Sequence, residues 1–187
     1  MIIFTKGCSV LEITYWQLFA FITAVWLAIR LVTAARNRGI DWLRELKLLT
    51  VFICIVVVAR IVYFPWHLQN GRIGTLVFDP ERIIPPWVNL VPFVHLFDVY
   101  EGWQRNLFGN IAMFIPVGLA WPFCFKKLDS IGKVVLAGFG FSLCIELSQL
   151  LFYSRGTDVD DLITNTLGAF IGAVVYFLLR RIFGRHR

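Results

Sequence analysis

Four polar side chains interrupt the longest apolar stretches of the sequence and are the first candidates for chemistry. Arg60 and Glu146 are ionisable, and Asn110 and Asn165 carry amides. Ionisable side chains are expensive inside a membrane, so by default they indicate a functional site. A structural alternative fits the same residues: Arg60 and Glu146 would form an ion pair, and the asparagines would make hydrogen bonds between helices.

Helical spacing arranges further polar residues into two stripes. Side chains three or four residues apart lie on the same face of a helix. The first stripe consists of Ser142, Glu146, Gln149 and Tyr153, and the second consists of Asp161, Asn165, Gly168 and Gly172. The two glycines follow a spacing that lets membrane helices approach closely, so we expect the second stripe to pack against another helix.

A short turn joins the two stripes and contains Arg155, Asp158, Asp160 and Asp161. Carboxylates at the start of a helix commonly cap free backbone N–H groups, which would explain the aspartates without any ligand. Alternatively, Arg155 would contact an anionic group, and the aspartates would form a hydrogen-bonding or hard-cation site. The sequence has no motif with metal-ligand spacing, so we predict no metal and no cofactor.

The composition indicates the kind of element that positions these residues. Apolar residues make up 58% of the 187 residues and charged residues make up 16%, against about 45–50% and about 25% in soluble proteins. A soluble chain of this length cannot bury so much apolar surface. The four cysteines are scattered along the chain, so a disulfide scaffold is not expected. We therefore predict a membrane protein whose main partner is the lipid bilayer.

Five stretches are long and apolar enough to cross a bilayer as helices. They cover residues 14–32, 46–66, 107–125, 134–153 and 162–179. We predict an all-α fold: a polytopic membrane protein with a bundle of five transmembrane helices, formed by a single domain over residues 1–187. Between the second and third spans, residues 93–103 are predicted to form an extracytoplasmic amphipathic segment at the headgroup level. An ordinary loop is the alternative for this segment.

The distribution of positive charge predicts the orientation. Twelve of the eighteen Lys and Arg residues fall in the first and third connections and in the C-terminal tail, whereas five fall on the other side and Arg60 lies within a span. We therefore predict a multi-pass cell-membrane protein with its N-terminus outside and its C-terminus in the cytoplasm. The net charge of +6 then mainly reflects orientation, and no nucleic-acid partner is expected. The four polar side chains would lie in the outer half of the bilayer and, together with Gln149, converge on one cavity, with Arg60 close to Glu146. The turn with Arg155 and Asp158 would form the rim of this cavity.

Four blocks of sequence, taken in order, resemble the VanZ-like family. They are residues 89–93 (NLVPF), 106–118 (NLFGNIAMFIPVG), 142–149 (SLCIELSQ) and 155–169 (RGTDVDDLITNTLGA). The resemblance implies a role in resistance to the lipoglycopeptide teicoplanin, and it implies no particular reaction. The shared motif positions are Asn89, Pro92, Phe93, Asn110, Pro116, Gly118, Glu146, Gln149, Arg155, Asp158, Asp160, Asp161, Asn165 and Gly168.

Three functional hypotheses follow. In the first, an outward-facing site binds an amphiphilic ligand at the outer leaflet, either a lipid-linked cell-wall precursor or the lipoglycopeptide. In the second, a membrane enzyme acts on a cell-envelope substrate with Glu146 and Asp158 as acid–base groups. In the third, the protein moves a ligand across the membrane, although the inner half of the spans lacks a matching polar path. The candidate substrate-binding residues are Arg60, Asn110, Glu146, Gln149, Arg155, Asp158, Asp160, Asp161 and Asn165.

Overall fold

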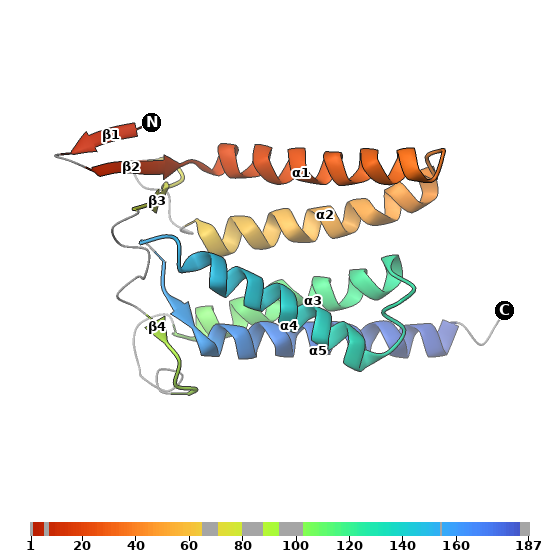
Figure 1. The fold of residues 1–187 in the computed structure, drawn as a ribbon. Coiled ribbons are helices and arrows are strands. Elements are labelled where there is room, and N and C mark those ends of the chain that lie inside the picture. The colour runs from red at the N-terminus through yellow and green to blue at the C-terminus, as the bar shows by residue number, and fades with distance from the viewer. Residues whose placement is uncertain are drawn as a thin grey trace. The chain divides into compact units, whose positions relative to one another are not determined.

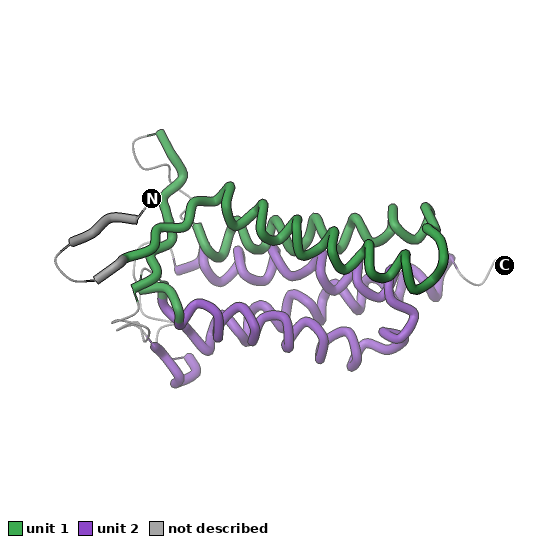
Figure 2. Tube along the Cα trace, turned by 45° about the horizontal axis from the view of Figure 1, so that its top comes forward, with its two compact units in different colours: residues 1–85, 151–155 green, residues 86–150, 156–187 purple. Residues whose placement is uncertain are grey.

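The fold was analysed in a computed structural model, which describes residues 2–5, 8–64, 71–79, 88–93, 103–153 and 155–183. The chain divides into two compact units (Figure 2). Unit 1 comprises residues 1–85 and 151–155, and unit 2 comprises residues 86–150 and 156–187.

Five helices dominate the described residues, and each is long and apolar enough to cross a membrane (Figure 1). The prediction of an all-α polytopic membrane protein with five spans is therefore confirmed. Segment 93–103, predicted to be amphipathic, falls largely outside the described residues. The helices are α1 (Tyr15–Arg36), α2 (Trp42–Tyr63), α3 (Trp103–Cys124), α4 (Ile131–Gln149) and α5 (Val159–Phe183).

Capping residues, rather than hydropathy alone, set the helix ends in unit 1. Thr14 forms a capping box with Gln17 at the start of α1. Asp41 caps the start of α2 by accepting a hydrogen bond from the backbone N–H of Arg44. With the cap at Asp41, α2 begins four residues before the predicted stretch 46–66. At its other end, α1 continues to Arg36, beyond the predicted stretch 14–32.

The connection between α1 and α2 is a tight turn with one residue in a left-handed conformation. The backbone N–H groups of Arg38 and Gly39 donate to the carbonyls of Ala35 and Ala34, which closes the end of α1. Arg38 has φ = 53°, a conformation that glycine adopts at lower cost. The sequence thus keeps an arginine where glycine would be the less strained choice.

Short strands accompany the helices. In unit 1, β1 (Ile2–Thr5), β2 (Cys8–Ile13) and β3 (Leu76–Phe78) form an antiparallel sheet in the order β1-β2-β3. In unit 2, β4 (Val88–Asn89) pairs in parallel with β5 (Thr157–Asp158). The second pair is short, yet it joins segments that are far apart in the sequence.

Helices α3 and α5 pack closely in unit 2 because glycines line their contact. A Cβ atom at Gly172 would lie 2.1 Å from the carbonyl oxygen of Ile115, and one at Gly168 would lie 2.2 Å from that of Ile111. On α3, a Cβ atom at Gly118 would lie 2.1 Å from the carbonyl oxygen of Ala169. The close packing expected of the glycine stripe is therefore present, and its partner is α3.

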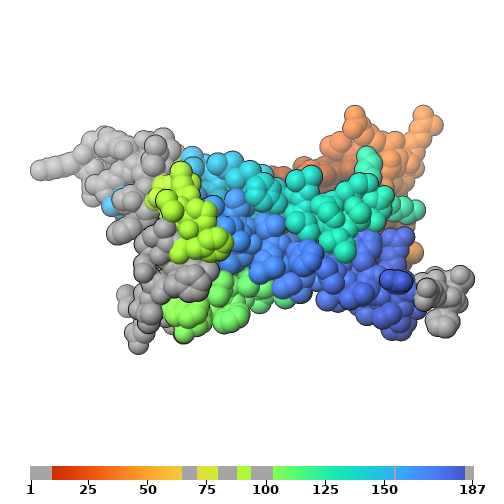
Figure 3. Space-filling view, turned by 90° about the horizontal axis from the view of Figure 1, so that it is seen from below, coloured from red at the N-terminus to blue at the C-terminus, as the bar shows by residue number. Residues whose placement is uncertain are grey.

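The lateral surface of the helices is largely apolar. Residues with more than half of their surface exposed include Trp16, Phe21, Leu31 and Phe108, as expected for side chains that face lipid. In unit 2, α4 and α5 run side by side along one face (Figure 3). Small side chains fill their contact, since a Cβ atom at Gly138 would meet the Cβ atom of Ala169 at 2.5 Å.

We expect Gly172→Ala to lower the free energy of unfolding by about 1–3 kcal/mol, because the added methyl group must displace a backbone carbonyl. Gly140→Ala, in α4, is the matched control: nothing lies within 4 Å of its Cβ position. Denaturation of each purified variant in mixed detergent micelles measures its free energy of unfolding. Equal stability of the two variants would show that the α3–α5 packing is looser than described.

Candidate functional site

At one end of unit 2, α3 begins, α4 ends and α5 begins (Figure 1). Hydrogen bonds connect polar and acidic side chains from these helix ends. The cluster, called the acidic cluster below, contains four carboxylates and four amide or hydroxyl groups that hydrogen-bond with them or with each other. Several members are almost fully buried, including Glu146 at 5% exposed and Asp160 at 7% exposed. Its members are Asn89, Asn110, Ser142, Glu146, Asp158, Asp160, Asp161 and Asn165.

A turn that follows β4 is attached to the start of α5 by two aspartates. The side-chain amide of Asn89 donates to Asp158 Oδ1 at 3.0 Å, and the backbone N–H of Phe93 donates to Asp160 Oδ1 at 2.9 Å. Asn89 also accepts a hydrogen bond from the backbone N–H of Val91 at 3.1 Å. Phe93 has φ = 66°, an unusual conformation for a bulky residue, and such strain is often found at functional sites.

Glu146 is held by the segment that precedes α5. Its Oε2 accepts a hydrogen bond from the backbone N–H of Asp158 at 3.2 Å, and its backbone carbonyl accepts one from Thr157 Oγ1 at 3.2 Å. The end of α4 and strand β5 are therefore connected through both the side chain and the backbone of Glu146.

The two asparagines connect neighbouring helices. Asn110 Nδ2, on α3, donates to Asp161 Oδ1, on α5, at 2.5 Å. Asn165 Nδ2, one turn further along α5, donates to Ser142 Oγ on α4 at 3.0 Å. Both asparagines thus make the interhelical hydrogen bonds that the structural alternative expected of them.

Helix capping explains only one of the three aspartates in the turn. Asp158 directly precedes α5, and its Oδ1 accepts the backbone N–H of Asp160 at 2.9 Å, as an N-cap residue does. Asp160 instead binds the turn at Phe93, and Asp161 binds Asn110. These two aspartates therefore connect α5 to other segments of unit 2.

Two buried acceptor atoms of the acidic cluster have no hydrogen-bond donor within the described part of the chain. They are Asp160 Oδ2 and Asn165 Oδ1, and Asn165 is only 2% exposed. Buried polar atoms nearly always have a partner in native proteins. These atoms are therefore positions at which a bound water or ligand would supply the missing donors.

The carboxylates of the acidic cluster lack cationic partners within the described residues of unit 2. At the opposite end of this unit, the exposed Lys133 pairs with Asp129 at 2.7 Å, which holds the pKa of Asp129 below its ordinary value. Among the described residues, no three acidic, cysteine or histidine side chains are grouped so that they can hold a metal ion. The site is thus rich in acceptors and poor in positive charge.

The two candidate arginines, Arg60 and Arg155, belong to unit 1, where both bind the C-terminal end of α2. Arg60 Nη1 donates to the carbonyl of Phe64 at 3.3 Å, and its guanidinium lies 5.8 Å from the ring centroid of Tyr15. Arg155 Nη2 donates to the carbonyl of Tyr63 at 2.6 Å. Positive side chains at this helix end stabilise its free carbonyls and its dipole.

Arg155 is also partly desolvated. Burial lowers the pKa of its guanidinium below the ordinary value, although an arginine stays charged at neutral pH. Its Nε is buried and has no acceptor among the described residues. Because Arg60 lies in unit 1 and Glu146 in unit 2, their expected approach stays a prediction.

The remaining candidates are Gln149, which is buried in the last turn of α4, and the residues of the turn itself. Sequence reasoning overlooked Thr157, whose hydroxyl binds the Glu146 backbone. The sequence did contain a signal for it, because Thr157 lies between Arg155 and Asp158 in the turn. The role of Phe93 depends on its backbone N–H and its positive φ, which the side-chain type does not indicate.

We expect the hydrogen bond between Asn110 and Asp161 to contribute measurably to stability, because it satisfies a carboxylate between two helices. A double-mutant cycle with Asn110→Ala and Asp161→Ala should give a coupling energy of about 1–2 kcal/mol. The same cycle on the exposed pair Lys133 and Asp129 is the control and should give a much smaller coupling. A negligible coupling between Asn110 and Asp161 would contradict the described contact.

Comparison with known proteins places these residues in a family. The VanZ/LLP1 family model matches residues 48–180, a range that includes every member of the acidic cluster. Protein VanZ of Enterococcus faecium is 35% identical over 91 residues, which cover 49% of this chain and 53% of that protein. The chain therefore matches about half the length of this curated relative. No solved structure matches it. The chain belongs to the VanZ/LLP1 family.

Proposed function

We propose that this protein contributes to resistance against the lipoglycopeptide teicoplanin by binding an amphiphilic ligand at the acidic cluster. The ligand is either a lipid-linked cell-wall precursor or the lipoglycopeptide itself. The resistance role is supported by membership of the VanZ/LLP1 family and by the similarity to Protein VanZ of Enterococcus faecium. The binding role is supported by the chemistry of the cluster.

The observation that carries the proposal is the pair of buried acceptors without donors, Asp160 Oδ2 and Asn165 Oδ1. A ligand that presents N–H or O–H groups would satisfy them. Peptide amides, sugar hydroxyls and amino groups all supply such donors, and the peptide and sugar parts of either candidate ligand contain them. A ligand without donors would leave both acceptors unsatisfied, at a cost of about 1–3 kcal/mol for each.

The charge of the cluster supports the same class of ligand. Glu146, Asp158, Asp160 and Asp161 bring four carboxylates together, and their described hydrogen bonds come from backbone N–H groups and from the amides of two asparagines. Carboxylates this close together and without a cation need further donors or a positive group if they are to carry their charge. A donor-rich or positively charged part of a ligand is therefore favoured here, and an anionic part would have to contact Arg155 or Arg60.

We also propose that the acidic cluster lies on the outer side of the membrane, as the distribution of Lys and Arg predicts. Unit 2 carries its acidic cluster at one end and the basic residues Lys126, Lys127 and Lys133 near the connection at the other. Short basic connections are retained in the cytoplasm. In this orientation the acidic cluster faces the leaflet in which cell-wall precursors and lipoglycopeptides are encountered.

Binding should weaken when Asp160 is replaced by its isosteric amide. Asp160→Asn keeps an oxygen for the backbone N–H of Phe93 and replaces the unpaired acceptor with a donor. We expect binding of teicoplanin or of a lipid-linked precursor to the purified protein to weaken about tenfold or more, the effect of losing one charged hydrogen bond. Glu146→Gln and Arg155→Ala should weaken it as well.

Asp129→Asn is the control, because Asp129 is exposed at the other end of unit 2. The same variants, expressed in a susceptible host, should lose protection against teicoplanin in the same order. If Asp160→Asn and Glu146→Gln bind as tightly as the wild type, the ligand site lies elsewhere. Chemical conversion of the precursor that disappears in Glu146→Gln would instead identify an enzyme.

The orientation has a direct test in a variant without native cysteines. Leu90, which is 73% exposed in the turn after β4, and Lys127, exposed in the connection between α3 and α4, are replaced singly by cysteine. In intact cells, a membrane-impermeant maleimide should label the cysteine at position 90 and not the one at position 127. The reverse pattern would overturn the orientation and the outward-facing site.

A further inference from the structure

The connection between α1 and α2 in unit 1 forms a cavity of about 270 Å³. Its polar lining residues are Arg30, Asn37, Asp41, Arg44 and Glu45. The cavity is independent of the acidic cluster, which belongs to unit 2. It lies where the end of one apolar helix meets the start of the next, and such positions fall at the membrane–water interface.

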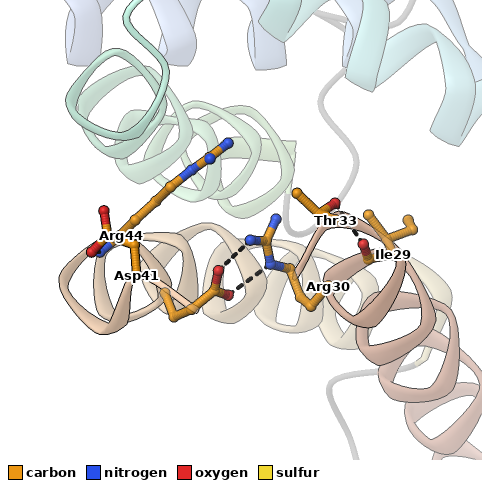
Figure 4. A network of polar contacts seen from close by, with 6 residues as sticks. Ile29, Arg30, Thr33, Asp41 and Arg44 are labelled. Carbon is orange, nitrogen blue, oxygen red and sulfur yellow. Dashed lines mark hydrogen bonds and ion pairs between the residues drawn. The ribbon is translucent and has the colours of Figure 1, made fainter. Parts of the chain in front are cut away.

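The negative groups of this cavity are already engaged. Arg30 donates two hydrogen bonds to Glu45, one of them at 2.7 Å from Nε, and thereby neutralises its carboxylate (Figure 4). Asp41 accepts the backbone N–H of Arg44 as the N-cap of α2. The last carbonyls of α1, at Thr33, Ala34 and Ala35, accept backbone N–H groups of the connection. The cavity therefore offers few free acceptors to a ligand.

The segment that forms this cavity carries more positive than negative groups, although its lining residues alone, two arginines and two carboxylates, balance in charge. Arg44 lines it, is exposed, and forms no ion pair within the part of the chain that the structure describes. Figure 4 shows the guanidinium of Arg44 apart from the dashed lines that leave Arg30. Residues 30–47 contain five Lys or Arg residues and two carboxylates, a net charge of +3. An anion is the ligand that this balance favours.

Arg38 adds to this charge at a conformational cost. It holds the left-handed position that ends α1, with φ = 53°, where glycine would be less strained. Strain of this kind points to a function when the surrounding structure maintains it. The turn keeps an exposed cation at the position where the backbone alone favours glycine.

Exposed apolar side chains flank the cavity and indicate the source of the anion. Ile40 is 51% exposed, Trp42 is 77% exposed and Leu43 is 65% exposed. Tryptophan at the end of a membrane helix typically lies at the headgroup level. A free phosphate would leave these side chains without a function, whereas the acyl chains of a lipid would cover them.

We propose that this cavity binds the phosphate group of an anionic membrane phospholipid. The guanidinium of Arg44 and the amide of Asn37 donate to the phosphate oxygens, and Arg36 and Arg38 add to the attraction at longer range. The acyl chains lie along Ile40, Trp42 and Leu43. Basic residues at the end of a membrane helix favour anionic headgroups on this physical basis.

Native mass spectrometry of the purified protein in detergent, titrated with single lipids, tests the proposal. Phosphatidylglycerol should bind more tightly than phosphatidylcholine. Arg44→Gln should weaken phosphatidylglycerol binding about fivefold, the effect of one arginine on an anionic headgroup. Asn37→Leu, which fills the cavity without changing the charge, should weaken it as well. Lys127→Gln is the matched control, since it removes one exposed charge in unit 2.

Each outcome decides the question. Selective loss of phosphatidylglycerol binding in Arg44→Gln and Asn37→Leu, with Lys127→Gln unchanged, supports the site. If Arg44→Gln and Lys127→Gln weaken phosphatidylglycerol binding equally and Asn37→Leu has no effect, the lipid is attracted by charge in general. That result would overturn the proposed site. Displacement of the lipid by millimolar inorganic phosphate would overturn the assignment to a lipid and identify a site for free phosphate.

Discussion

The burial of carboxylates among membrane-spanning helices is the constraint on which the rest of unit 2 depends. Each such group must receive hydrogen bonds from the protein, because lipid supplies none. Here the donors are the amides of Asn89 and Asn110 and the backbone N–H groups of Phe93, Asp158 and Asp160. The family motif thus contains both the carboxylates and their donors. Asparagines in the earlier blocks of the motif donate to aspartates in its last block.

The glycines of α3 and α5 make this arrangement possible. Gly168 lies against the carbonyl of Ile111, and Ile111 directly follows Asn110. A larger side chain at Gly168 would push α3 and α5 apart close to the point where Asn110 meets Asp161 at 2.5 Å. The distance between the helix backbones therefore sets the length of the hydrogen bond. Two features that look separate in the sequence, a glycine stripe and a polar stripe, act together on one pair of helices.

The sequence was sufficient to predict the number of helices, and its candidate residues include most members of the cluster, but it was less informative about their partners. Length and apolarity indicated five spans because few other structures bury so much apolar surface. The start of α2 was predicted four residues too late, since Asp41 caps it through a hydrogen bond that hydropathy does not include. The end of α1 was predicted four residues too early, since the helix continues through the polar residues Thr33 and Arg36. For Glu146, side-chain charge suggested Arg60 as a partner, which stays a prediction, and the described hydrogen bond comes from the backbone of Asp158. Backbone donors depend on conformation, and the side-chain types do not reveal them.

The parallel pairing of β4 with β5 has a consequence for the order in which the protein is made. Asn89 and Asp158 are separated by 69 positions, and α3 and α4 must be synthesised and inserted before the two strands can meet. Until α5 follows them, Asn110 and Glu146 enter the membrane without the partners that α5 and β5 provide. The most polar helices of unit 2 therefore pass through a stage of synthesis at which they are least stable in lipid, and the insertion of α5 ends that stage.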